Sequence, residues 1–305
     1  MDGQKKNTNI SSQASVNKYG VSGRGVFSLI KELMEANSTA SDVLIIKKLN
    51  AGINDAFSLV KEKEFKMAEI AFDQISVKII DSFNQYSFQY YCCELLYLPG
   101  YAYLEYKKGK KDEAISLTRK SIEYAIILQS YPSSDNIALY ISQMLDNLAR
   151  LYLVCNEMDE WKEVVLENIH FLANGHCPAH CENFIAPHNF NTNPLRYVML
   201  TGVLNNTILS IVKHKLTAAY KLFDSIALED ASQPLMAQIY NWVKLNRLLT
   251  QQKAGSELFE TTLNEFLAYK NSEYSDLKIL KLFIKSRISK EKVQLYSHRK
   301  LIAFV

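Results

Sequence analysis

The stretch Pro99–Ile122, PGYAYLEYKKGKKDEAISLTRKSI, decides the fold because it holds two helices and the turn between them. An aromatic-rich helical run ends in KKGKK at residues 107–111, and glycine is the residue that most readily closes the last turn of a helix. The next helix opens on the acidic residues Asp112 and Glu113, which are favourable at its positive N-terminal end. The small residues Gly109 and Ala114 allow a close approach of the two helices. The stretch therefore predicts an antiparallel helical hairpin.

Weaker copies of this hairpin recur along the chain. Each copy aligns by a turn position and by the residue five places later, early in the second helix. The second positions advance by 46, 47, 58 and 39 residues. The pairs are Lys63/Ala68, Gly109/Ala114, Asn156/Trp161, His214/Ala219 and Lys253/Leu258. Because Ala68–Phe72–Ile75 matches Ala219–Phe223–Ile226 in type and spacing, the pattern favours stacked hairpins over a helical bundle without repeats.

The hairpin around Gly109 and Ala114 resembles the helix–turn–helix of the tetratricopeptide (TPR) family. A period near 46 residues exceeds the 34 of a standard TPR, so the resemblance is to the wider TPR-like superfamily. It covers roughly residues 42–270 and implies an all-α, TPR-like superhelix of about five antiparallel helical hairpins. In such arrays the first helices line a concave groove and the second helices lie on the convex side. The third hairpin departs from the family pattern, with Asn156 where glycine is usual and Trp161 where alanine is usual.

The domain organisation follows from where the helical pattern begins and breaks. Residues 1–25 are polar and are expected to form a flexible N-terminal arm. Residues 26–305 are expected to form a single TPR-like α-solenoid domain. A loop insertion near 170–195 interrupts the period, and a helix near 275–300 is expected to cap the last apolar face.

Composition narrows the classes of function. Ten glycines and six prolines in 305 residues favour long helices, and a net charge of +3 argues against nucleic-acid binding by the molecule as a whole. No run of about 18 apolar residues predicts a membrane span, and the N-terminus lacks the apolar core of a secretory signal. Five cysteines do not suggest a disulfide framework. We expect a cytoplasmic protein, and the apolar end LIAFV (301–305) is expected to pack on the array or on a second copy, as in a homodimer.

The TPR-like resemblance implies a groove that binds extended peptides, often through asparagine amides. Asparagine occurs nine residues before the turn position in three hairpins, and the other two hairpins have Gly100 and Lys244 there. An amide can both donate and accept hydrogen bonds to a peptide backbone. The alternative interpretation is a set of solvated or capping residues. The predicted groove residues are Asn54, Tyr103, Asn147, Arg150, Asn205, Asn241 and Lys244.

A second constellation lies in the insertion. His176, Cys177, His180 and Cys181 combine imidazole and thiolate ligands at spacings that suit tetrahedral zinc, although no second distant pair accompanies them. Reversible pairing of Cys177 with Cys181 is another interpretation, and a structural loop is a third. The preferred function is a peptide- or protein-binding adaptor without cofactor or catalysis. The alternative is a zinc-dependent or redox accessory protein or enzyme centred on residues 170–188.

Overall fold

The computed structural model describes residues 26–181, 184, 190, 193–228, 234–269 and 277–295, and within them the regular elements are all helical. The predicted arm, residues 1–25, lies outside the described residues. Among the described elements, η1 (Ala179–Cys181) and η3 (Thr217–Ser225) are 3₁₀ helices. The α-helices are α1 (Val26–Asn37), α2 (Ala40–Lys61), α3 (Phe65–Ser82), α4 (Phe88–Lys107), α5 (Lys111–Leu128), α6 (Ile137–Cys155), α7 (Met158–Asn174), α8 (Pro194–Lys213), α9 (Pro234–Thr250), α10 (Glu257–Ala268) and α11 (Leu277–Leu295).

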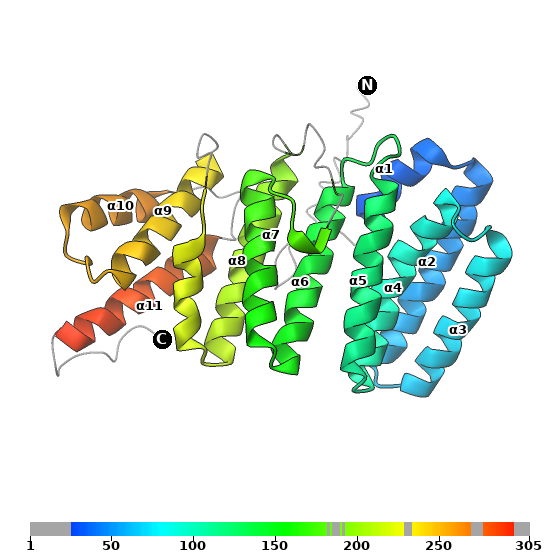
Figure 1. Ribbon diagram of the computed structural model, residues 1–305, viewed down its shortest axis with the longest axis horizontal. Helices are drawn as coiled ribbons and strands as arrows, with labels where there is room; N and C mark the ends of the chain where they lie inside the picture. The colour runs from blue at the N-terminus through cyan, green and yellow to red at the C-terminus, as the bar shows by residue number, and fades with distance from the viewer. Residues whose placement is uncertain are drawn as a thin grey trace, which may run out of the picture.

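Consecutive helices pack against each other as antiparallel hairpins, and the hairpins follow one another in a row from α3 at one end to α10 at the other (Figure 1). The pairs α2/α3, α4/α5, α6/α7 and α9/α10 make the hairpins, and α5 and α7 pack on the next first helices, α6 and α8. The prediction of an all-α chain of sequential hairpins is confirmed.

Five hairpin turns share one backbone conformation, the Schellman motif. In each, a residue with positive φ donates its N–H to the carbonyl three residues earlier, and the next residue donates to the carbonyl five residues earlier. At Gly109 these bonds run to Tyr106 (3.0 Å) and, from Lys110, to Glu105 (2.9 Å). The positive-φ residues are Lys63, Gly109, Asn156, Lys215 and Gln252. The predicted turn positions are therefore correct in the first three hairpins and displaced by one residue at His214 and Lys253.

Four of the five turns place a residue other than glycine in the left-handed region, where a Cβ atom is strained by about 1 kcal/mol. Lys63 has φ of 69°. We expect Lys63→Gly to raise the free energy of unfolding by about 0.5 kcal/mol, the relief being partly offset by glycine's greater unfolded-state entropy. Urea denaturation measures the change. The control is Gly109→Ala, which should destabilise, and the explanation is wrong if both variants shift stability in the same direction.

The fourth hairpin differs from the others because its second arm is the 3₁₀ helix η3. Ala219, Phe223 and Ile226 are buried, as their match to Ala68, Phe72 and Ile75 predicts. However, Ile226 lies beyond the end of η3. The side chain of Arg247 on α9 donates to the carbonyl oxygens of Asp224 (3.1 Å) and Ile226. These hydrogen bonds hold the backbone at the C-terminal end of η3 against α9.

The break after the third hairpin is shorter than predicted, because α7 continues to Asn174 and α8 begins at Pro194. The buried Arg196 in the first turn of α8 donates from its guanidinium to the carbonyl oxygens of Leu172 and Ala173. These are among the last carbonyls of α7, which have no partner within their own helix. Arg196 therefore holds together the two helices that the insertion separates.

Helix α1 lies outside the row of hairpins and packs on both α4 and α6. Its apolar face, including Ile30, Leu33 and Met34, is fully buried. At its C-terminal end, Asn37 donates to the carbonyl oxygen of Pro132 in the connection between α5 and α6 (2.8 Å). The N-terminal helix thus joins the first helices of two successive hairpins.

By length and composition, the span Leu195–Lys213 in α8 is the one candidate membrane span in the described part of the chain. It is 67% buried among the surrounding helices, which is the behaviour of a core helix.

Candidate functional site

The first helices of hairpins one and two carry an aromatic–lysine cluster, made of Phe57 and Lys61 on α2 with Tyr103, Tyr106 and Lys107 on α4. The ring centroids of Phe57 and Tyr103 are 5.1 Å apart, and those of Tyr103 and Tyr106 are 6.3 Å apart. The Lys61 ammonium lies 4.3 Å from the Phe57 centroid, and that of Lys107 lies 5.1 Å from Tyr103. Within the described part of the chain, neither lysine has an ion-pair partner.

Two of the predicted groove residues belong to this region. Tyr103 is a half-buried member of the cluster, and Asn54 is exposed about one helical turn before Phe57. Gly100, at the equivalent position in hairpin two, is buried. A Cβ atom there would lie only 3.1 Å from Cζ of Phe72, so Gly100 serves the close packing of α3 on α4 and presents no surface to a ligand.

Three more of the predicted residues lie on α6 and α8. Arg150 is exposed and forms an ion pair with Asp146, while Asn147 is half-buried. Asn205 is only 5% exposed, and its neighbour Asn206 donates to the Asp146 carboxylate (3.0 Å). The turn lies at Lys215, one residue later than predicted, and the residue nine places before Lys215 is Asn206.

The remaining two predicted residues, Asn241 and Lys244, are half-buried on α9. The seven predicted residues therefore do not form one continuous exposed ladder. The structure brings Tyr103 into the aromatic–lysine cluster and Arg150 next to Asp146.

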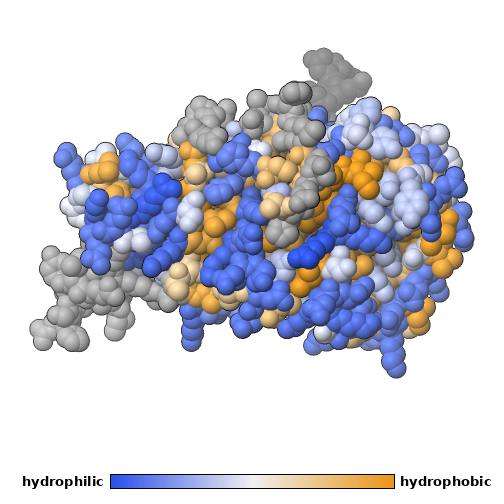
Figure 2. Space-filling view, viewed as in Figure 1, coloured by the Kyte–Doolittle hydropathy of each residue, from blue (hydrophilic) through white to orange (hydrophobic). Residues whose placement is uncertain are grey.

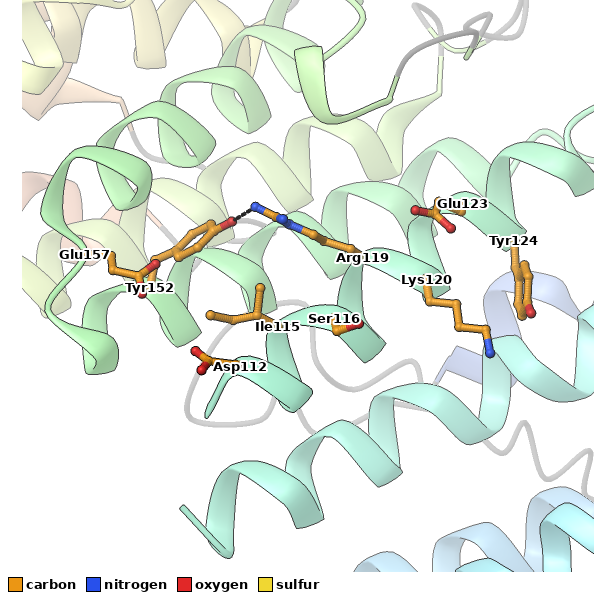
Figure 3. A pocket seen from close by; sticks show the side chains of 9 residues that line it. All are labelled: Asp112, Ile115, Ser116, Arg119, Lys120, Glu123, Tyr124, Tyr152 and Glu157. Carbon is orange, nitrogen blue, oxygen red and sulfur yellow. Dashed lines mark hydrogen bonds between the residues drawn. The ribbon is translucent and has the colours of Figure 1, made fainter. Parts of the chain in front are cut away.

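A pocket that the sequence patterns did not reveal lies on the second-helix side, along α5 (Figure 3). It has a volume of about 570 Å³. The guanidinium of Arg119 donates to the hydroxyl of Tyr152, which comes from α6, and the two side chains meet across the pocket. Charged residues of both signs line the pocket. In the sequence, such a mixture along one helix is typical of a solvent-exposed face, so it does not indicate a pocket. The lining residues are Asp112, Ile115, Ser116, Arg119, Lys120, Glu123, Tyr124, Tyr152 and Glu157.

An ion-pair network holds the end of α4 that carries Tyr106 and Lys107. The carboxylate of Glu105 is almost fully buried and pairs with Lys108 (2.9 Å) and Lys110 (3.0 Å). Lys108 also pairs with Glu69 on α3 (2.6 Å). Burial opposes the ionisation of Glu105, but the interactions with Lys108 and Lys110 outweigh it, so the pKa of Glu105 lies below its ordinary 4.5.

A lowered pKa in the folded state means that Glu105 stabilises the fold above pH 4.5 and that this contribution is lost as the pH falls through the folded-state pKa. We expect Glu105→Gln to lower the free energy of unfolding by about 2 kcal/mol at neutral pH. The difference from wild type should shrink below pH 4.5. Urea denaturation over a pH series measures it, with the exposed Glu123→Gln as control. A difference that stays constant down to low pH would contradict the assigned charge pairing.

The four predicted metal ligands are only partly described, since the side chain of His180 lies outside the described residues. Cys177 donates from its thiol to the carbonyl of Cys181 (3.1 Å), and Cys181 is fully buried. Burial raises the pKa of both thiols, which disfavours the thiolate form that binds zinc or attacks a disulfide. Among the described side chains, no group of three or more His, Cys, Asp or Glu is placed to hold a metal ion.

Zinc at this loop stays a prediction that metal analysis of the purified protein tests. Stoichiometric zinc that is lost in the double variant Cys177→Ser/Cys181→Ser would establish the site.

No family model, no curated protein and no solved structure matches the chain.

Proposed function

We propose that the protein is a cytoplasmic, TPR-like adaptor that binds an extended peptide segment of a partner protein. The observation that carries this proposal is the aromatic–lysine cluster across α2 and α4. The succession of hairpins with one shared turn supports the TPR-like interpretation, in which first helices face the ligand. No reaction is proposed.

The chemistry of the cluster favours a peptide that combines acidic and apolar side chains. Lys61 and Lys107 offer two ammonium groups without carboxylate partners in the described structure, and exposed charges of this kind pair with acidic residues. The rings of Phe57, Tyr103 and Tyr106 offer half-buried apolar surface, which aromatic anchors at interfaces commonly supply. Asn54 lies nearby with an amide that can hold a peptide backbone.

A fluorescence binding assay with a set of short synthetic peptides tests the proposal. The set varies acidic and apolar residues independently. We expect acidic–apolar peptides to bind best, and the variants Tyr103→Ala and Lys61→Gln/Lys107→Gln to lose at least about tenfold in affinity, since loss of an interface anchor costs more than 1 kcal/mol. Lys48→Gln, an exposed lysine elsewhere on α2, is the matched control.

The same assay distinguishes the cluster from the α5 pocket. Binding that is unchanged in the cluster variants but lost in Arg119→Gln would overturn the proposed surface and move the site to the pocket. If no peptide in the set binds, the proposed peptide-binding function is overturned. Affinity capture from the native cell, followed by mass spectrometry, then identifies the partner for whichever surface binds.

A further inference from the structure

Helix α3 closes one end of the row and presents an unusually apolar outer face. Met67, Ile70, Val77 and Ile80 are exposed by 55%, 51%, 58% and 50%, although they belong to a helix whose opposite side is in the core. In Figure 2 small hydrophobic patches are visible at the edge of this end of the molecule. Among the described elements, α3 packs mainly on α2 and α4, which contact its opposite side and leave the outer face uncovered. Clustered exposed apolar side chains on one helix face commonly mark an interface.

The order of residues along this face is symmetric about the midpoint between Asp73 and Gln74. Ile70 and Val77 are equidistant from that midpoint, and so are Met67 and Ile80. Farther out, Lys66 and Asp81 form a third equidistant pair, of opposite charge. Lys66 and Asp81 are both exposed, and within the described structure neither takes part in an ion pair.

An antiparallel pair of identical helices related by a two-fold axis brings together residues equidistant from the axis. With the axis at the midpoint of α3, Ile70 of one copy meets Val77 of the other. Lys66 then meets Asp81 of the second copy at each end of the contact. The fifteen-residue separation of Lys66 and Asp81 spans roughly 22 Å along one helix, so they cannot pair within a single copy.

We propose that the outer face of α3 binds a second copy of this chain, forming a two-fold symmetric antiparallel helix pair. The four apolar side chains are buried in its centre, and the Lys66–Asp81 pairs fix its direction. The four apolar residues and the two charged residues are fewer than the roughly 20–30 residues a side of a standard stable interface, so the dimer is weak and forms at high protein concentration. Asp73 lies beside the axis in both copies, and the two carboxylates repel each other there.

Sedimentation velocity over about a hundredfold range of concentration tests the proposal on the full chain, because self-association depends on concentration by mass action. We expect wild type to move from monomer to dimer. Val77→Glu should remain monomeric, since it places a charge in the apolar centre. Asp73→Asn should strengthen association by removing the repulsion. Lys285→Asp on the distant α11 is the control and should behave like wild type.

Charge-reversal variants test the proposed pairing of Lys66 with Asp81 directly. Lys66→Asp alone and Asp81→Lys alone should each weaken association, because like charges then meet at both ends. An equimolar mixture of the two variants should form a heterodimer, since every end pair is again of opposite charge. Circular dichroism and thermal unfolding check that each variant is folded.

Three outcomes overturn the proposal: a wild type that is monomeric throughout, association unaffected by Val77→Glu, or a mixture of the charge variants that fails to associate. The second would place self-association on another face, and the first would leave the α3 face to another protein or to segments of the chain outside the described residues.

Discussion

Replacing Phe72 with alanine should lower the free energy of unfolding by about 4 kcal/mol, a larger loss than we expect from any other single substitution proposed for this protein. Phe72 is fully buried on α3, and its ring lies 5.6 Å from that of Tyr97 and 5.7 Å from that of Tyr101. Its edge also fills the space that Gly100 leaves open on α4. Removing the ring therefore creates a cavity between α3 and α4 beside Gly100. Urea denaturation measures the loss.

The complementary change tests whether Gly100 and Phe72 share one space. Gly100→Leu alone should destabilise by about 3 kcal/mol, because a side chain there meets the Phe72 ring. In the double variant the leucine can occupy the cavity left by Phe72→Ala, so the combined loss should be smaller than the sum of the two. Strict additivity would show that the two residues act independently and would contradict the packing argument.

Arg196→Met should lower the free energy of unfolding by about 3 kcal/mol. The substitution keeps much of the apolar stem but leaves the carbonyl oxygens of Leu172 and Ala173 without the donor that Arg196 provides. It also removes a cation that lies 5.1 Å from the Phe190 ring centroid and that favourably faces the negative end of α7. Thermal and urea unfolding measure the effect.

Arg196→Lys serves as the control for charge. A lysine keeps the cation but lacks the planar fork that reaches two acceptors together, so it should recover only part of the lost stability. Full recovery would mean that charge alone holds α7 to α8. A methionine variant as stable as wild type would refute the role assigned to Arg196.

The helices and the turns were predictable from sequence because both depend on local chemistry. The apolar spacing indicated the helical hairpins, and the turn alignment found the positive-φ residues Lys63, Gly109 and Asn156. Only the second hairpin has a glycine at the positive-φ position, and in the last two hairpins adjacent residues, such as His214 and Lys215 in the fourth, are equally plausible from sequence. The alignment could therefore be wrong by one residue, and one residue rotates a helical position by about 100°. In the fourth hairpin this one-residue difference selects the buried Asn205 instead of Asn206.

The contacts between hairpins were not predictable in the same way. Gly100 looked like a groove position without a side chain, and only the structure brings Phe72 against it. The α5 pocket depends on Tyr152 from the next helix, and no spacing within α5 indicates that partner. The symmetric order of residues on the α3 face can be read from the sequence. That this face is exposed depends on the position of α3 at the end of the row, which only the structure shows.

The position of α1 has a mechanical consequence. In a stack of hairpins that contact only their neighbours, each interface between hairpins can move independently of the others. Helix α1 contacts both α4 and α6 and so restrains the second hairpin relative to the third, and helix α11 contacts both α8 and α9 and so restrains the fourth hairpin relative to the fifth. Amide hydrogens of α4 and α6 should therefore exchange together and slowly, and so should those of α8 and α9, whereas those of α10, which packs mainly on α9, should exchange earlier.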